Sequence, residues 1–230
     1  MRLRLASLAV TGLLALTAAC NEEDDNKDTD AAVEETEGAY LPWAEGNSWT
    51  YRVTNNGEVS TKVTTIGAEE EIGGNGPNAQ KRAFRVVTKK GEQDETVSWQ
   101  GVVGDSVVRY REQSFGATSG DLEQEEHWDP YKLHFDGSDE HTQEGADWLE
   151  KYQETKIPAG GPEATAEARD RWTVDAPSVE VEVPAGKFKA VVVQKASGGT
   201  LKTYWYVRGV GKVKETGGQT EELIEYTVAP

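Results

Sequence analysis

Residues 48–66 restrict the fold of this chain more than any other stretch of the sequence. They read SWTYRVTNNGEVSTKVTTI, in which Trp49, Tyr51 and Val53 alternate with polar residues. A period of two is typical of a β-strand that buries one of its faces. An Asn-Gly pair at positions 56 and 57 follows, and this pair is the strongest short signal for a hairpin turn. The stretch therefore predicts two antiparallel strands.

The rest of the chain repeats this pattern of β-rich runs separated by glycine-containing turns, with few apolar stretches of helical period. Polar loops are expected at 69–80 and 157–169. Further strands are expected at 82–89, 95–103, 105–113, 171–183, 187–196, 201–207 and 221–228.

Two similar motifs suggest an internal duplication. EGNSWTY begins at Glu45 and EGADWLEKY begins at Glu144, and residues 83–91 and Trp99 have counterparts at 188–199 and Trp205. The alternative is that β-proteins reuse such turns and aromatic strands. We expect an all-β, antiparallel domain over 40–230, with two related units at about 40–125 and 140–230 that form a curved sheet, half-barrel or sandwich.

The N-terminus has the features of an exported protein. Arg2 and Arg4 precede an apolar run that ends in small residues, so residues 1–19 are expected to be a signal peptide. The following LTAAC resembles the lipobox of bacterial lipoproteins, although Leu16 lies one position further from the cysteine than is usual. The resemblance implies that Cys20, the single cysteine of the chain, becomes an acylated N-terminus.

Residues 20–39 are expected to form a disordered, lipidated tether, because they are strongly acidic and nearly free of large apolar side chains. The formal charge of −17 for the whole chain argues against binding to nucleic acids. The expected partners are the membrane, through the acyl chains, and a lipid or another envelope protein.

All three histidines, His127, His134 and His141, lie in the segment between the two expected units. Imidazoles and nearby carboxylates could bind a divalent metal. Positions seven apart point to opposite faces of a strand, and Pro130 and Gly137 disfavour a helix. We therefore expect a polar connector there, without a metal or cofactor. The chain has no Gly-x-Ser-x-Gly motif, so an enzyme is not expected.

Six of the seven tryptophans fall into two groups. Trp49 and Trp99 of the first unit match Trp148 and Trp205 of the second unit. All four are expected in the core. Trp43 and Trp128 lie outside the expected strands. They are the candidates for a ligand-binding surface or cavity rim.

The chain resembles a family of exported bacterial lipoproteins of unknown function over most of residues 40–228, and most specifically over 183–214. The similar segments are VPAGKFKAVVV from 183, TYWYVRGVGKVK from 203 and ELIEYTV from 222. This chain has Lys187 where the family has Thr, and Val207-Arg208 where the family has Ala-Pro. Without that proline, the sequence does not fix where the strand that begins near 201 ends. The resemblance implies an antiparallel β-fold in the Gram-negative cell envelope, without catalytic residues.

Three functions are consistent with these features. The first is a lipid-anchored, non-enzymatic protein of the outer membrane that faces the periplasm, or the cell surface, and binds an apolar ligand or lipid in a concave sheet. The second is a structural module that contacts envelope proteins or polysaccharide through sheet edges and loops. The third is a metal-dependent hydrolase that uses the segment from His127 to His141.

Overall fold

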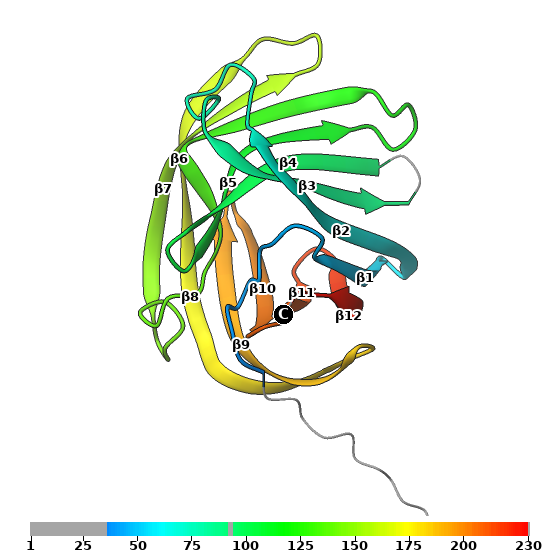
Figure 1. The fold of residues 1–230 in the computed structure, drawn as a ribbon, viewed down its shortest axis with the longest axis vertical. Helices are drawn as coiled ribbons and strands as arrows, with labels where there is room; N and C mark the ends of the chain where they lie inside the picture. Colours follow the sequence, from blue (N-terminus) through cyan, green and yellow to red (C-terminus); the bar gives the residue numbers. More distant parts are fainter. Residues whose placement is uncertain (1–35, 92–93, 230) are drawn as a thin grey trace, which may run out of the picture. The chain divides into compact units, whose positions relative to one another are not determined.

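The computed structural model describes residues 36–91 and 94–229, and within them the chain forms a β-barrel (Figure 1). No helix among these residues is long and apolar enough to cross a membrane. The strands are β1 (Ser48–Asn55), β2 (Glu58–Glu71), β3 (Arg82–Lys90), β4 (Asp94–Val103), β5 (Ser106–Phe115), β6 (Leu122–Asp136), β7 (Asp147–Pro158), β8 (Ala164–Val183), β9 (Gly186–Ser197), β10 (Thr200–Val207), β11 (Gly211–Thr216) and β12 (Thr220–Thr227).

Each strand pairs in an antiparallel manner with its neighbours in sequence, and β1 pairs with β12 to close the barrel. The predicted all-β, antiparallel fold is confirmed. The predicted open form, a half-barrel or a sandwich, is wrong. The twist of consecutive strands brings β12 back beside β1, and this pairing satisfies the backbone groups that an open edge would expose.

The hairpin of β1 and β2 forms as its sequence predicts. Asn56 and Gly57 have φ values of 49° and 86°, the left-handed conformation that a tight type I′ turn requires at both central positions. Trp49, Tyr51 and Val53 are all buried, which confirms the predicted alternation of β1.

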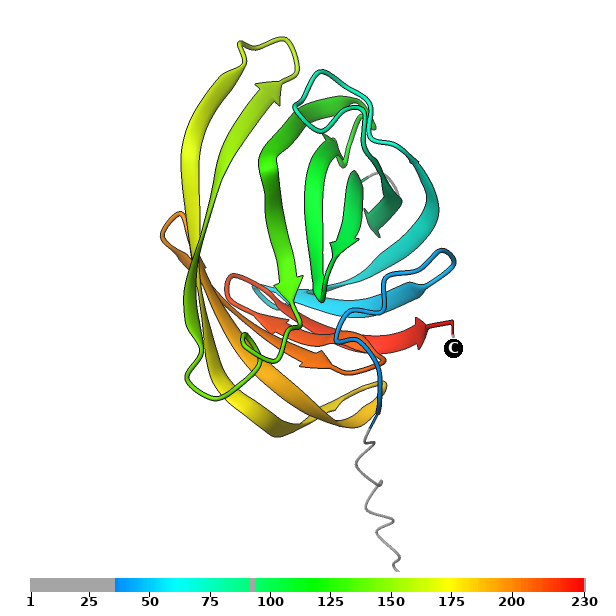
Figure 2. The same cartoon turned by 60° about the vertical axis from the view of Figure 1, so that its left-hand side comes forward.

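Of the three segments expected to be irregular, two are largely strand, and the one at 69–80 is strand only at its start. β2 continues to Glu71, β8 begins at Ala164, and most of the expected connector belongs to β6. The hairpin of β7 and β8 projects at the top of Figures 1 and 2. Its tip, from 159 to 168, is almost entirely exposed. A strand with water on both faces needs no apolar residues, so its sequence resembles that of a loop.

The segment before β1 packs across one end of the barrel. The Gly209 N–H donates to the Ala39 carbonyl at 2.8 Å, and the rings of Tyr40 and Phe135 meet edge to face at 5.9 Å. These contacts join the N-terminal segment to the β10–β11 turn and to the end of β6. Residues 36–39, expected in the tether, are therefore part of the fold.

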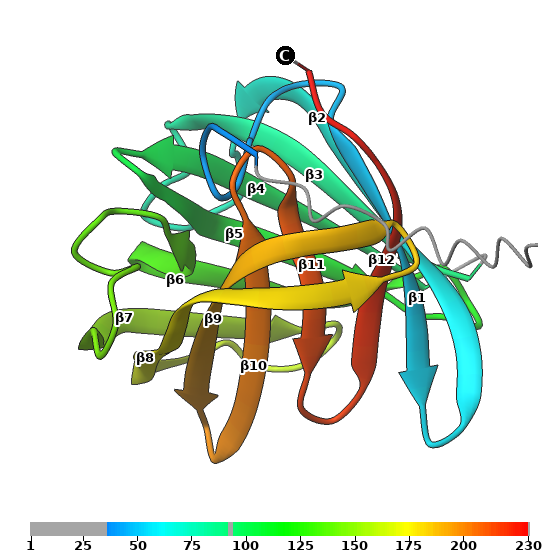
Figure 3. The same cartoon turned by 90° about the horizontal axis from the view of Figure 1, so that it is seen from below.

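The two ends of the barrel differ. Figure 3 shows the N-terminal segment, the β10–β11 turn and the C-terminus at one end, which we call the plugged end. The β1–β2, β9–β10 and β11–β12 turns lie at the opposite end, which we call the turn end.

The motifs matched between the two halves lie on strands six positions apart. Trp49 and Trp148 belong to β1 and β7, and Trp99 and Trp205 belong to β4 and β10. Trp148 is only partly buried, whereas we expected a largely buried side chain like that of Trp49. The strand order agrees with a duplication, which stays a prediction.

Candidate functional site

A cavity of about 640 Å³ occupies the interior of the barrel. Inward-facing side chains line it because alternate residues of a strand share one face. On β4, for example, Thr96, Ser98 and Gln100 line the cavity, and Val97 and Trp99 between them do not. Small-molecule sites commonly have volumes of about 300–1,000 Å³.

Two side chains of the N-terminal segment, Leu41 and Trp43, reach into the cavity at the plugged end. The ring of Trp43 stacks on Trp49 with 5.5 Å between centroids and meets His134 edge-on at 5.2 Å. Trp43 is only 9% exposed. These aromatic contacts close this end of the cavity.

The cavity extends to the turn end. Ser197 and Thr200, which flank the β9–β10 turn, line it, and Thr200 is exposed. The Lys202 side chain, on the same side, is 39% exposed. The cavity therefore opens to solvent at the end opposite Trp43.

The lining is strongly basic although the whole chain carries a formal charge of −17. Three carboxylates, Glu112, Glu215 and Glu221, line the cavity. Six basic residues face them, an excess of three positive charges: Lys62, Arg109, Lys132, Lys195, Lys202 and Lys212.

Five of these groups form an ionic cluster on one wall. Lys212 donates to Glu215 and, at 2.7 Å, to Glu221; Lys62 also pairs with Glu221, and Lys202 pairs with Glu215 at 2.7 Å. Burial raises the pKa of Glu215, but Lys212 and Lys202 outweigh it, so this pKa lies well below its ordinary value. Burial and the charge of Lys212 lower the pKa of Lys62 to about 8. The cluster neutralises most of its own charge.

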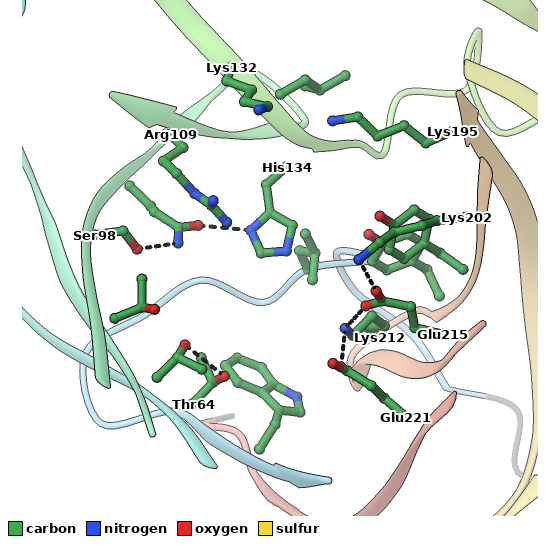
Figure 4. A pocket seen from close by; sticks show the side chains of 18 of the residues that line it. Thr64, Ser98, Arg109, Lys132, His134, Lys195, Lys202, Lys212, Glu215 and Glu221 are labelled. Carbon is green, nitrogen blue, oxygen red and sulfur yellow. Dashed lines mark hydrogen bonds and ion pairs between the residues drawn. The ribbon is translucent and has the colours of Figure 1, made fainter. Parts of the chain in front are cut away.

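The other basic residues, Arg109, Lys132 and Lys195, form what we call the basic trio. Arg109 pairs with Glu112, and Lys195 pairs with Asp170, each at 2.7 Å. In the close view, the amino groups of Lys132 and Lys195 point toward each other across the cavity (Figure 4). The carboxylate of Asp170 is not part of the lining, so Lys195 lies between this partner and the cavity.

His134 lies next to the basic trio and is held by a relay of hydrogen bonds (Figure 4). The Gln100 amide N–H donates to Ser98 Oγ at 2.7 Å, and Gln100 Oε1 therefore accepts from His134 Nδ1 at 2.8 Å. Burial, together with nearby cations such as Arg109, holds the pKa of His134 well below its ordinary value. The ring is neutral, and its Nε2 remains a hydrogen-bond acceptor.

Two donors of the lining are buried without a hydrogen-bond partner in residues 36–91 and 94–229. They are Nε1 of Trp43 and Nε of Arg109. Buried N–H groups in folded proteins are nearly always paired, so these two donors are exceptions.

The two tryptophans predicted to bind ligand lie in different environments. Trp43 lines the cavity, whereas Trp128 is buried in the wall. Its Nε1 donates to Glu154 at 3.1 Å, and the amino group of Lys132 lies 5.2 Å from its ring centroid. Glu154 also accepts from Lys132 at 3.3 Å. Trp128 therefore supports a lysine of the basic trio rather than the cavity surface.

The three histidines have separate partners. His127 Nε2 lies 2.7 Å from Glu125, and His141 Nδ1 lies 2.7 Å from Asp136. Only His134 lines the cavity. In the part of the chain that the structure describes, no group of three or more His, Cys, Asp or Glu side chains could hold a metal ion. The predicted lipidation site, Cys20, lies outside the described residues.

Sequence reasoning missed the basic lining. In β10, Lys202, Tyr204 and Tyr206 recur at every second position and face the same side of the strand. The sequence does not say that this side is the interior, because charged residues on an alternating strand usually face solvent.

Comparison with known proteins supports the fold. No protein-family model matches the chain, and no curated protein matches its sequence. A protein from Bacteroides fragilis NCTC 9343, described as an exported protein with a YmcC-like fold, matches 83% of this chain and 99% of its own, with a TM-score of 0.53 and 12% identity. A protein from Parabacteroides distasonis ATCC 8503, described as a lipoprotein, matches 84% of this chain and 100% of its own, with a TM-score of 0.44 and 10% identity.

Proposed function

We propose that this chain is a lipid-anchored, non-enzymatic protein of the cell envelope that binds a small ligand inside its barrel. The observation that carries the binding role is the cavity of about 640 Å³, which is closed by Trp43 and open at the β9–β10 turn. A barrel whose interior only served stability would fill this space with packed side chains.

The location follows from the N-terminal sequence. The signal peptide and Cys20 support export and acylation, and the similar fold of the exported B. fragilis protein agrees with export. We place the protein in the outer membrane, facing the periplasm. Equilibrium gradient centrifugation of the two membranes and protease accessibility in intact cells test this placement.

The lining changes the expected ligand. An apolar ligand would need a dry, apolar surface, but six basic side chains and six serine and threonine side chains line this cavity beside its six aromatic rings. The serines and threonines are Thr64, Thr88, Thr96, Ser98, Ser197 and Thr200. A polar ligand is therefore the better candidate.

The alternatives have less support. Contacts through sheet edges would be confined to short stretches, because every strand in the described part of the chain pairs on both sides over part of its length. A metal-dependent hydrolase needs converging ligands, and the three histidines have separate partners.

Native mass spectrometry of the protein isolated from its own envelope tests the binding role. We expect a bound small molecule in the wild type. Thr64→Phe should abolish the adduct, because the Thr64 side chain faces the cavity.

Thr65→Phe is the matched control, since Thr65 is the next residue of β2 and is exposed. It should retain the adduct. A wild-type protein free of any bound molecule, or equal occupancy in the two variants, would contradict the proposed role.

A further inference from the structure

The three side chains of the basic trio carry more N–H donors than their carboxylate partners use. A guanidinium carries five N–H donors and an ammonium three, so one carboxylate partner leaves several unused. The ion pairs of Arg109 with Glu112 and of Lys195 with Asp170 are each 2.7 Å long, and the Lys132 pair with Glu154 is longer, at 3.3 Å. These ion pairs therefore leave several N–H donors of the trio unused.

The register of the strands brings these groups together. Arg109 of β5 lies opposite Lys132 of β6, and His134 follows Lys132 by two residues on the same face of β6. Lys195 approaches from β9 on the facing wall (Figure 4). Three cations thus converge from two walls on one region of the cavity.

One donor in this region is unsatisfied. Nε of Arg109 is buried and has no hydrogen-bond partner among the described residues. Its guanidinium is held by Glu112 through another nitrogen. Buried cations are stable when anions complete their coordination, and a carboxylate or phosphate matches these donors.

The neighbouring groups suit hydroxyls. Nε2 of the neutral His134 can accept a hydrogen bond but cannot donate one, since Nδ1 holds the proton toward Gln100. Trp43 contributes an unpartnered N–H on a ring stacked against Trp49. An acceptor and stacked rings beside a basic trio suit a hydroxylated molecule that carries an anionic group.

Building on the proposed binding function, we propose that the ligand is a hydroxylated anion, whose carboxylate or phosphate lies between Arg109, Lys132 and Lys195 and whose hydroxyl group is bound by His134. This chemistry has two sources. One is a soluble sugar phosphate or sugar acid, and the other is the head group of an anionic amphiphile.

Isothermal titration calorimetry with the purified protein tests the proposal. The anionic probes are glucose 6-phosphate, glucuronate and lysophosphatidate, and the neutral counterparts are glucose and monoacylglycerol. We expect at least one anion to bind about tenfold or more tightly than its neutral counterpart, and to bind more weakly as sodium chloride is raised. The preferred probe distinguishes the soluble source from the amphiphile.

Arg109→Gln and Lys195→Gln should each weaken binding of the preferred anion by about tenfold or more, because each removes a charge-assisted hydrogen bond. Arg52→Gln is the matched control. Arg52 pairs with Glu222 at 2.7 Å, and its side chain is 46% exposed. The control should bind as the wild type does.

The salt dependence of the wild type keeps the test valid if a variant fails to fold. Equal affinity for anions and their neutral counterparts would overturn the anionic assignment and leave the proposed binding function standing. Failure of the wild type to bind any of the three anions would also overturn the assignment. If native mass spectrometry finds no molecule bound to the protein isolated from its own envelope, the binding function itself is overturned.

Discussion

The indole rings of Trp43 and Trp49 stack with their centroids 5.5 Å apart and their planes within 19°. This contact joins the segment before the barrel to β1 and closes one end of the cavity. Trp49 is itself fixed, because its Nε1 donates to the carbonyl of Val210 in the β10–β11 turn. The plugged end therefore depends on packing between parts of the chain that are far apart in sequence.

Trp43→Ala should lower the free energy of unfolding by about 3–5 kcal/mol, the usual cost of emptying a buried aromatic site. The sequence suggested a much smaller loss, because Trp43 lies outside the alternating pattern. Urea denaturation followed by far-ultraviolet circular dichroism measures the change. Leu201→Ala, at a position that is 56% exposed, should cost no more than about 0.5 kcal/mol. Equal losses in the two variants would show that Trp43 does not pack as described.

Lys212→Met should cost about 3–5 kcal/mol, because it leaves Glu215 and Glu221 buried with too little compensating charge. Lys214 is the matched control on the same strand, and its ion pair with Glu222 is 3.5 Å long at the surface. Lys214→Met should cost less than about 1 kcal/mol. Adding Glu215→Gln and Glu221→Gln to Lys212→Met should recover part of the loss, and no recovery would argue against the ionic cluster.

His134 should stay neutral through the mildly acidic range, because its folded pKa lies well below the 6.5 of a free histidine. The unfolded chain then binds more protons than the folded chain below that pH. Stability should therefore decrease as the pH falls below about 6.5, by at most about 1.4 kcal/mol per pH unit from this residue. The Cε1–H signal of His134 in proton NMR, assigned with His134→Gln, should not move between pH 7.5 and 5.5. A titration centred near 6.5 would show that the ring is not buried among cations.

Cys20→Ser should abolish labelling with a palmitate analogue and leave the precursor uncleaved by the lipoprotein signal peptidase, because no other cysteine is present. Partitioning into the detergent phase of Triton X-114 should fall as well. Unchanged labelling of the variant would rule out the lipobox assignment.

Superposition of the two halves of the barrel tests the duplication. Residues 45–110 should superpose on 144–214 with strands in the same order, so that β1 overlays β7 and β4 overlays β10. Strands that fail to overlay in sequence order would reduce the shared Glu-Gly-x-x-Trp motif to a recurring turn.

The sequence predicts the strands best where one face is apolar. The alternation of Trp49, Tyr51 and Val53 identified both the strand and its buried face. It failed for β6 and for the tip of the β7–β8 hairpin, where polar residues occupy strands that lie against solvent or a wet interior. Closure of the barrel was not predictable either, since it depends on the summed twist of all the strands.

The binding surface was harder to predict than the fold. Trp43, which the sequence suggested as a ligand-binding residue, lines the cavity, but the sequence pointed to neither Lys195 nor Arg109. A basic side chain on an alternating strand has the same pattern whether it faces water outside or a cavity inside. Only the curvature of the closed sheet distinguishes the two, and curvature leaves little trace in a single sequence.

The plugged end of the barrel and the mouth of its cavity lie at opposite ends of the molecule. Thr36, where the described chain begins, contacts the β10–β11 turn at the plugged end, and Cys20 lies only sixteen residues earlier. If Cys20 is acylated, the tether joins the barrel at its closed end, and the mouth beside Thr200 lies at the opposite end of the barrel. Ligand exchange would then take place on the aqueous side, and a soluble donor or acceptor could reach the cavity while the protein stays anchored.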